Sequence, residues 1–294
     1  MSKTAVIVDS SSYIDKNTIK KYNIFVVYDP IIFATEPITE DHWKTQQSFF
    51  TDLNNAKEVP TTSQPTPGSF QKVFEEVTSQ GYDSAIIVTL SSGISGTYQS
   101  AKNIAEAYEG FKEVLVWDSK IAILGAGNQA IYAAELLKQG KTISEIKKSL
   151  KTLRDSTSVF FVVDSIKHLQ RTGRISSGQA LVAGAIKIKP ILTFDDGEIK
   201  AAARARKMDG AWEFIEKNFS EIVKNAKNKL RVTISDANNP ELADLWLAKG
   251  KELWPQVTFE RGIIGPFIAV HTGEKSVGFI WADDYQNLLG ENND

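Results

Sequence analysis

The chain has 294 residues, enough for two domains of the usual ~100–200 residues each. Its 34 basic and 36 acidic residues nearly cancel, and no stretch concentrates Lys or Arg, so we expect neither nucleic acid nor an anionic membrane surface as a partner. Cysteine is absent, which excludes disulfides and thiolate ligands, and we expect no bound metal.

The first residues lack the pattern of a signal peptide. Residues 1–9 pass directly into a short apolar run that ends at Asp9. No apolar run approaches the ~20 residues that a membrane-spanning helix needs. We therefore expect a cytoplasmic protein without stable membrane insertion.

Short β-branched runs alternate with helical patterns in the first half of the chain. Phe70, Val73, Phe74 and Val77 share one helical face after Thr66-Pro67, a typical helix start. Such alternation predicts a mostly parallel sheet between helices, a three-layer α/β/α domain over residues 1–160. The expected strands are Ala5–Val8, Ile24–Val27, Ala85–Leu90 and Val114–Trp117, and further helices are expected at about Ile121–Gln139 and Ile143–Leu153.

The second half has a different pattern, and we place a domain boundary near residue 160. Asp195-Asp196-Gly197 separates two short strands as a hairpin turn would, because Asp-Gly favours the positive φ angles of tight turns. The pattern predicts a two-layer α/β domain with a mixed sheet over residues 161–294, so that the whole chain is of the α/β class. Its expected elements are strands at Val159–Val163, Ile191–Phe194, Glu198–Ala201, Arg231–Ser235, Ile263–Val270 and Val277–Trp281, and helices at Ala211–Val223 and after Pro240.

Two hydroxyl-rich turns, Thr61–Gly68 and Ser91–Thr97, each lead toward an amphipathic helix. Hydroxyls and unpaired backbone N–H groups at such places bind anions. Neither turn contains Lys or Arg, so the expected anion is a weakly charged group such as a carboxylate. The candidate ligands are Thr62, Ser63, Ser95 and Gly96, although Thr62 and Ser63 could instead cap the helix that starts near Pro67.

Ser95 has an alternative role as the nucleophile of a lipid or ester hydrolase. The sequence Gly93-Ile94-Ser95-Gly96-Thr97 lacks the Gly-x-Ser-x-Gly spacing of serine hydrolases, but a histidine elsewhere could still serve as its base. A second motif, Gly125-Ala126-Gly127, imitates a dinucleotide fingerprint. Because the preceding strand is expected to end near Asp118, these glycines fall inside a helix, and close helix packing explains them better.

Three further features have both a structural and a functional interpretation. His271, after a strand-like run, is either a structural group or a hydrogen-bonding partner of an acid head group. Arg174 is either a surface charge or an orienting guanidinium beside the site. Residues 180–186 are apolar on nearly all sides, which predicts a buried helix or the wall of a tunnel for an alkyl chain.

Several sequence blocks, in this order and at these spacings, resemble the DegV family over nearly the whole chain. They are Thr62-Ser63-Gln64-Pro65, Ser91–Ser100, His168-Leu169 with Gly173-Arg174-Ile175-Ser176, Lys189-Pro190-Ile191-Leu192, and Gly265-Pro266 with His271.

The resemblance implies a two-domain protein that binds one long-chain fatty acid, such as palmitate, stearate or oleate, without another cofactor. It further implies a non-catalytic subunit that presents the acid to an ATP-dependent fatty acid kinase, which releases acyl phosphate for phospholipid synthesis. By motif, Thr62 and Ser95 bind the carboxylate, His271 completes the contact, Arg174 organises the network, and Arg206 contacts the kinase. A lipid sensor that works without a kinase is a further alternative.

Overall fold

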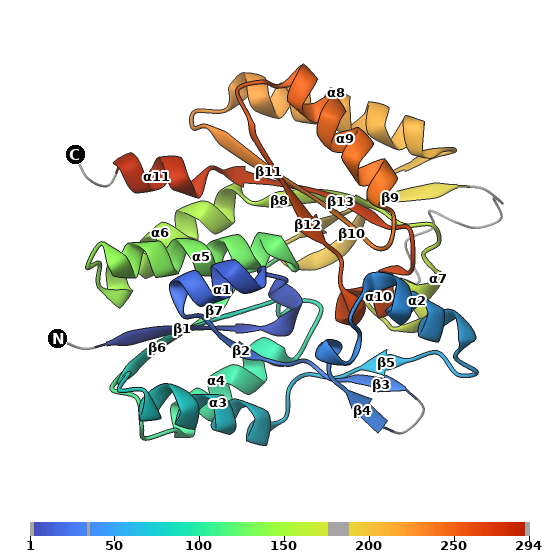
Figure 1. Ribbon diagram of the computed structural model, residues 1–294. Coiled ribbons are helices and arrows are strands. Elements are labelled where there is room, and N and C mark those ends of the chain that lie inside the picture. Colours follow the sequence, from blue (N-terminus) through green and yellow to red (C-terminus); the bar gives the residue numbers. More distant parts are fainter. Residues whose placement is uncertain (1–2, 34–35, 176–187, 292–294) are drawn as a thin grey trace.

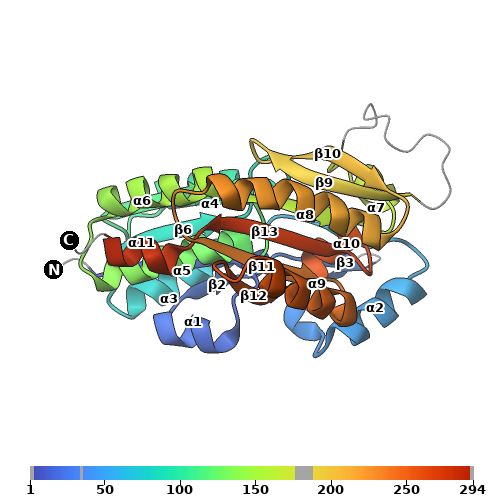
Figure 2. The same ribbon diagram turned by 90° about the horizontal axis from the view of Figure 1, so that it is seen from above.

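The computed structural model describes residues 3–33, 36–175 and 188–291, and it contains two large sheets and one small one. Figure 1 shows the parallel sheet in the lower half, the mixed sheet in the upper half, and helices α5 and α6 between them. The two ends of the chain lie at the same end of the molecule, one beside β1 (Thr4–Asp9) and the other beside α11 (Tyr285–Glu291) (Figures 1 and 2). Among the helices of the described ranges, none has both the length and the apolar character needed to cross a bilayer.

The first sheet confirms the predicted parallel arrangement. All neighbouring strands are parallel, in the order β2-β1-β6-β7. Side chains alternate as a sheet buried on both faces requires: Ile7 packs in the cluster that contains Phe74, whereas Val8 packs in the cluster that contains Ile131. The strands are β1 (Thr4–Asp9), β2 (Phe25–Val27), β6 (Ser84–Thr89) and β7 (Glu113–Asp118).

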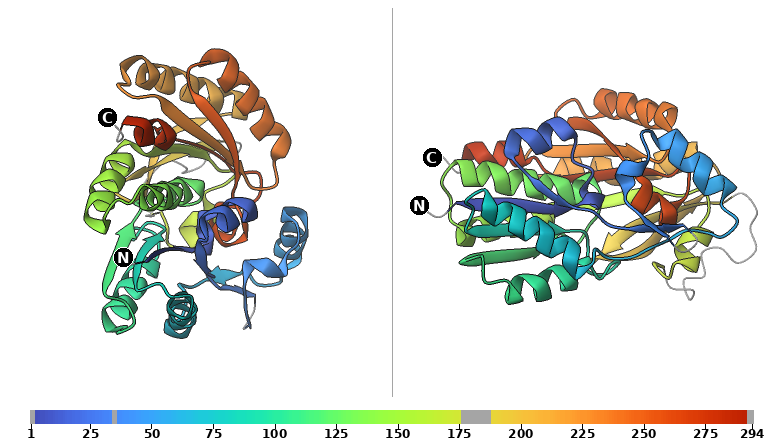
Figure 3. Two further views of the ribbon diagram at one scale, coloured as in Figure 1. Left: turned by 60° about the vertical axis from the view of Figure 1, so that its left-hand side comes forward. Right: turned by 60° about the horizontal axis from the view of Figure 1, so that its bottom comes forward.

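Helices cover both faces of this sheet, which gives the predicted three layers (Figure 3). Thr66 caps the helix that begins at Pro67, as the sequence predicts, by accepting a hydrogen bond from the Ser69 N–H. The helix expected from residue 121 begins three residues later, at Leu124. One face carries α3 (Pro67–Ser79) and α4 (Thr97–Ala107), and the other carries α1 (Lys16–Tyr22), α5 (Leu124–Lys138) and α6 (Ile143–Ser156).

The second sheet has six strands in the order β10-β9-β8-β13-β11-β12 and is mixed as predicted, because only the β11–β12 pair is parallel. Helices α8 and α9 cover one face with large aromatic side chains, among them Trp212 and Trp246. At the β9–β10 turn, Asp196 and Gly197 both have positive φ, so this hairpin is also confirmed. The elements are β8 (Ser158–Val162), β9 (Lys189–Asp195), β10 (Glu198–Ala205), α8 (Met208–Asn225), β11 (Leu230–Asp236), α9 (Pro240–Leu253), β12 (Thr258–Ile263) and β13 (Val277–Asp283).

One predicted strand is wrong. Residues 263–270 do not form a strand: β12 ends at Ile263, and Pro266 opens helix α10 (Pro266–Thr272). The run resembles a strand because it is short, branched and apolar, and the seven residues of α10 are too few to display helical periodicity. Burial on nearly all sides removes the remaining polar contrast, since Phe267, Ala269 and Val270 are all buried.

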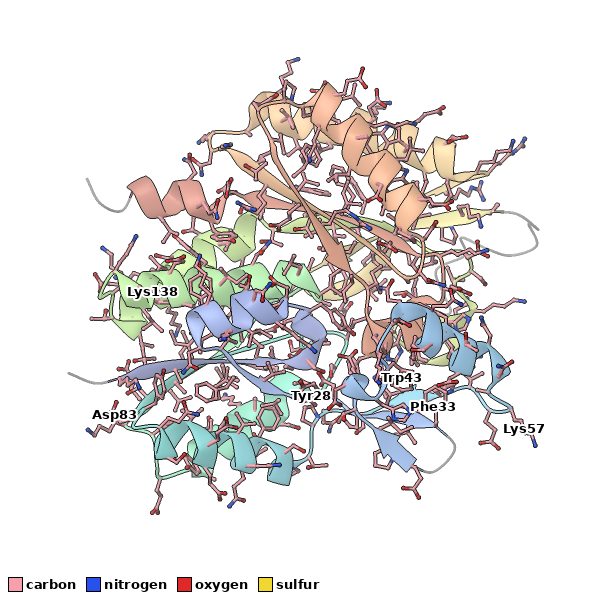
Figure 4. The ribbon with its side chains drawn as sticks, in the orientation of Figure 1. Tyr28, Phe33, Trp43, Lys57, Asp83 and Lys138 are labelled. Atoms are coloured by element: carbon pink, nitrogen blue, oxygen red, sulfur yellow. The ribbon has the colours of Figure 1, made fainter. Side chains whose placement is uncertain are left out.

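A segment that the sequence did not reveal joins β2 to α3. It forms a small antiparallel sheet in the order β4-β3-β5 together with a helix, on the side of the molecule where α10 lies (Figure 1). In Figure 4, Phe33 and Trp43 of this segment lie beside each other, and their ring centroids are 5.5 Å apart. The elements are β3 (Ile31–Phe33), β4 (Glu36–Ile38), the 3-10 helix η2 (Glu40–His42), α2 (Gln46–Asn55) and β5 (Thr61–Thr62).

The division into domains at residue 160 stays a prediction. β8, which spans this position, belongs to the mixed sheet. The last helix, α11 (Tyr285–Glu291), packs against α5, so the C-terminal end of the chain returns to the N-terminal half. Tyr285 and Leu288 accordingly share a hydrophobic cluster with Ile131.

The glycine pair in α5 generates a test of close packing. A Cβ at Gly127 would lie 2.8 Å from the Ser12 carbonyl oxygen and 2.9 Å from Ile14 Cγ1, so we expect Gly127→Ala to lower the free energy of unfolding by about 1–3 kcal/mol. Gly68→Ala, in the first turn of α3, is the matched control, because its Cβ would meet nothing closer than 3.9 Å. Urea denaturation of both variants measures the difference, and equal stability of the two would contradict the packing explanation.

Candidate functional site

A largely apolar cavity lies between the parallel sheet and the mixed sheet. Its void is about 760 Å³, including the part open to solvent. Both halves of the chain contribute, through the segments that follow β6 and β7, through the inner face of the mixed sheet and through α10. The apolar lining consists of Leu90, Ile94, Ile121, Ala122, Ile123, Val159, Phe161, Leu169, Phe194, Ile199, Ile264, Phe267, Ile268, Gly278 and Ile280.

Six polar residues complete the lining, and we call them the polar end of the cavity: Thr62, Ser63, Ser95, Arg174, His271 and Thr272. Five of them were selected from the sequence as candidates. They come from four separate segments, so the fold has to bring together residues as distant as 62 and 271. A mainly apolar void with a few convergent polar groups is the usual form of a small-molecule site.

Thr62 and Ser63 do not cap α3, because Thr66 does so. Thr62 instead lies on β5 and pairs with Ile31 of β3, and the Ser63 N–H donates to the Pro30 carbonyl at 3.2 Å. The turn leads into α3 as predicted, but the alternative in which Thr62 and Ser63 cap this helix is wrong. The small sheet holds them in place at the cavity wall.

Ser95 lies in the turn between β6 and α4, at the carboxyl edge of the parallel sheet where ligands of open α/β sheets bind. Its Oγ accepts from the Thr97 N–H at 3.2 Å and is 2.9 Å from Thr97 Oγ1. Gly96 is the N-cap of α4 but does not line the cavity. A Cβ at Gly96 would lie 3.2 Å from the side chain of Gln64, so glycine lets the two hydroxyl-rich turns approach each other.

The Ser95 turn also contacts the mixed sheet. Ser91 Oγ donates to the Gly197 carbonyl of the β9–β10 hairpin at 2.7 Å. A Cβ at Gly93 would lie only 2.3 Å from the same oxygen, so the two turns touch backbone to backbone. The hairpin tip thus rests on the segment that carries Ser95.

His271 lies in the last turn of α10, and not at the end of a strand as the sequence suggested. Burial, with the charge of Arg174 and the neighbouring His168 as smaller causes, lowers the pKa of His271 to about 3, so the imidazole is neutral at pH 7. Its Nε2 is 2.7 Å from Thr62 Oγ1. Its Nδ1 is buried and has no hydrogen-bond partner among the described residues. Buried polar atoms normally have a partner, so this nitrogen is an unmet hydrogen-bonding position at the polar end.

Arg174 follows helix α7 (Lys167–Arg171) and is half-buried against the Ser95 turn. Its Nε donates to the Ile94 carbonyl at 3.2 Å, and its Nη1 donates to the Thr172 carbonyl at 2.5 Å. Burial lowers the pKa of its guanidinium from the usual value, but an arginine has ample margin to stay charged at neutral pH. Arg174 therefore places a positive charge beside the turn that carries Ser95.

A second depression adjoins the polar end from the outside, and we call it the outer hollow. It is lined by Glu58, Val59, Pro60, Thr61, Thr62, Arg171, Thr172, Arg174 and His271. Thr62, Arg174 and His271 line both the cavity and the outer hollow. These three side chains thus form the partition between the apolar interior and the surface.

Two sequence candidates lie elsewhere. Arg206 is exposed directly after β10 and lines neither the cavity nor the outer hollow. Residues 180–186, the proposed apolar wall, lie outside the described residues. Conversely, the sequence analysis missed Arg171 and Thr272, whose only signal was their proximity in sequence to Arg174 and His271.

The architecture and the site together define a class: an α/β protein with a parallel and a mixed sheet and an apolar ligand cavity between them. The family model described as "Uncharacterised protein, DegV family" matches residues 3–284. A DegV domain-containing protein of Listeria monocytogenes is 34% identical over 280 residues, which cover 95% of this chain and 98% of that protein. The chain belongs to the DegV family.

Solved structures of DegV family proteins have a similar fold. The chain is similar to DegV of Bacillus subtilis, described as a fatty acid binding protein, with 32% identity, a TM-score of 0.87 and coverage of 97% of this chain and 100% of that one. It is also similar to a DegV family protein of Thermus thermophilus, whose structure is described by its fatty acid binding, with 28% identity, a TM-score of 0.87 and coverage of 96% and 100%.

The burial of neutral His271 generates a prediction about pH. The unfolded chain takes up a proton at this histidine near pH 6.5, whereas the folded chain does so only near pH 3. Folding stability contributed by this group is therefore lost as the pH falls below 6.5. Relative to His271→Gln, the wild type should lose about 3 kcal/mol of unfolding free energy between pH 7 and pH 4. Denaturation at both pH values measures this, and a difference that does not change with pH would refute the assignment.

Proposed function

We propose that this protein binds one long-chain fatty acid, with the acyl chain in the cavity and the carboxylate at the polar end, and presents that carboxylate to an ATP-dependent kinase. The observation that carries the proposal is the partition formed by Thr62, Arg174 and His271, which borders both an apolar interior and the surface. A fatty acid has the matching form, because its only polar group lies at one end.

The chemistry of the polar end suits a single carboxylate. The Ser95 hydroxyl and the Nδ1–H of neutral His271 supply neutral donors, and Thr62, which then donates to His271 Nε2, keeps the ring proton on Nδ1. Arg174 adds a nearby positive charge. A phosphate or a nucleotide normally has more cationic contacts or a glycine-rich loop. Each methylene removed from water contributes ~0.8 kcal/mol, so the apolar lining would supply most of the affinity while the polar end sets the orientation.

The similarity to the Bacillus subtilis and Thermus thermophilus proteins supports the same ligand class for this chain. Palmitate, stearate and oleate are the candidates, and no further cofactor is needed for binding.

The outer hollow supports presentation of the head group. A carboxylate held by the partition side chains would have its acyl chain on one side and the surface on the other, where a partner's phosphoryl donor could approach. The kinase would perform the chemistry and acyl phosphate would be the product, for phospholipid synthesis in the cytoplasm. Exposed Arg206 is the proposed contact with that kinase.

The arrangement argues against a hydrolase that uses Ser95. A nucleophilic serine needs a base within hydrogen-bonding reach, but among the described residues the hydrogen-bonding partners of Ser95 Oγ are both atoms of Thr97. His271 Nε2 contacts Thr62 instead. We therefore propose a non-catalytic binding subunit.

Binding of the carboxylate is tested by native mass spectrometry and by titration with oleate. The purified wild type should carry a fatty acid or bind added oleate. Ser95→Ala should weaken binding by roughly 1.5–3 kcal/mol, because it removes a hydrogen bond to a charged group. Thr62→Ala should also weaken binding, because it removes the hydrogen bond that keeps the His271 proton on Nδ1. Ser100→Ala, on the helix that follows, is the control and should bind as the wild type does. A wild type that neither carries nor binds any fatty acid would overturn the proposed function.

The role of Arg206 is tested by reconstitution with a bacterial fatty acid kinase and ATP. Arg206→Ala should retain oleate affinity, because its side chain lies away from the cavity, but should produce acyl phosphate at least tenfold more slowly. Arg204 is an exposed arginine on β10, two residues before Arg206, so Arg204→Ala shows whether loss of any positive charge in this region slows turnover. Loss of oleate affinity in Arg206→Ala, or normal turnover, would contradict this assignment.

A further inference from the structure

A cluster of buried carboxyl groups lies directly behind the Ser95 turn. Asp9, Asp29 and Glu40 come from three different segments, and Asp9 and Asp29 are almost completely buried. Among the described residues, none of the three forms an ion pair with Lys, Arg or His. The position is marked in Figure 4 by Tyr28, which precedes Asp29 where the chain leaves β2 for the small sheet.

Asp29 connects to Ser95 through one hydroxyl. Asp29 Oδ1 lies 3.3 Å from Thr97 Oγ1, which lies 2.9 Å from Ser95 Oγ. On its other side, the Ser10 hydroxyl donates to Asp29 Oδ2 at 3.2 Å, and the Asp29 N–H donates to Ser10 Oγ at 3.1 Å. A continuous line of polar groups therefore leads from the cavity wall to a carboxyl group that no solvent reaches.

Burial favours the protonated form of this carboxyl group. Desolvation and the nearby carboxyls of Asp9 and Glu40 raise the pKa of Asp29 well above its usual value, although the Ser10 hydroxyl and the Ser11 N–H act in the opposite direction. Because Oδ2 already accepts from Ser10, the proton belongs on Oδ1, which faces Thr97.

The protonation state of Asp29 decides which way the hydroxyls point. An ionised Asp29 can only accept, so Thr97 would donate to it, and the Ser95 hydroxyl would turn to donate to Thr97. A protonated Asp29 donates to Thr97, which then donates to Ser95. Since each hydroxyl has a single hydrogen, only the second arrangement leaves the hydrogen of Ser95 available to a ligand in the cavity.

We propose that Asp29 is a positioning residue of the carboxylate site: as a buried neutral acid it donates through Thr97 to Ser95 and so aims the Ser95 hydroxyl at the bound carboxylate. The inference rests on the proposed function and extends it to a residue outside the cavity. An ionised Asp29 would also repel the ligand's negative charge, which acts in the same direction.

The same cluster of carboxyl groups also contacts helix α10, which carries His271. Glu40 Oε1 accepts from the Phe267 N–H at 2.6 Å and from the Tyr13 hydroxyl. Phe267 is in the first turn of α10, and His271 is four residues further along the same helix face, with the two ring centroids 6.2 Å apart. The buried acids thus lie behind both the Ser95 turn and the helix that carries His271.

The test is a set of coupled substitutions measured by oleate titration at pH 7.5. Thr97→Val, nearly isosteric, and Asp29→Leu interrupt the line and should each weaken binding about tenfold, similar to Ser95→Ala. In the Ser95→Ala background the same substitutions should add less than about twofold, because the hydroxyl that they orient is already absent. Asp29→Asn, which can donate through its amide and cannot ionise, should restore binding to within about threefold of the wild type, and so should Thr97→Ser.

Thr89→Val is the matched control. Thr89 is equally buried in β6, and within the part of the chain that the structure describes its hydroxyl has a single hydrogen bond, to the Trp117 carbonyl at 3.4 Å. Any effect of Thr89→Val should be the same with and without Ser95→Ala. Thermal melting identifies variants that do not fold, and Thr97→Val retains the test if Asp29→Leu is one of them.

The outcomes distinguish the positioning role of Asp29 from fatty acid binding itself. Losses in Thr97→Val or Asp29→Leu that multiply fully with that of Ser95→Ala would overturn the positioning role, as would an Asp29→Asn variant as weak as Asp29→Leu. Either result leaves fatty acid binding itself intact. A wild type without affinity for oleate would overturn the proposed function and this inference together.

Discussion

The hydrogen bond between Thr62 and His271 joins residues 209 positions apart and closes the polar end of the cavity. Thr62 is held by the small sheet between β2 and α3, and His271 by the short helix α10, so neither partner belongs to one of the two large sheets. The cavity therefore depends on insertions at the edges of the sheets. The sheets supply the apolar walls, and the insertions supply the polar groups and the boundary with the surface.

Burial determines the chemistry of this region more than net charge does. His271 is neutral because the apolar surroundings and Arg174 disfavour a second positive charge, and burial beside Asp9 and Glu40 raises the pKa of Asp29, which favours its neutral form. Neutral groups of this kind keep their hydrogen-bonding capacity without attracting counter-ions or water. A site built from them can hold a charged head group at the end of an apolar space, with the Arg174 guanidinium nearby.

The sequence predicted the layers well, because alternation of branched strands with amphipathic helices is a strong local signal. It also found Ser95, since glycines beside a serine after a buried strand mark a turn at the carboxyl edge of a parallel sheet. It failed at α10, where seven mostly buried residues show no periodicity, and it gave no sign of the small sheet. Asp29 could not have been selected either, because a single acid after a strand resembles any surface carboxylate until its burial is known.

The contact of Ser91 with the β9–β10 hairpin has a consequence for the chain as a whole. Because of this contact, the turn that carries Ser95 is part of the junction between the parallel and the mixed sheet. The contact that closes the cavity on this side is therefore also a contact between the two sheets. Any occupant that touches both walls then acts as a cross-link: by mass action it favours the joined arrangement over every opened one. Ligand binding and contact between the two sheets are then coupled, so the ligand-free protein should open at this junction more readily than the ligand-bound one.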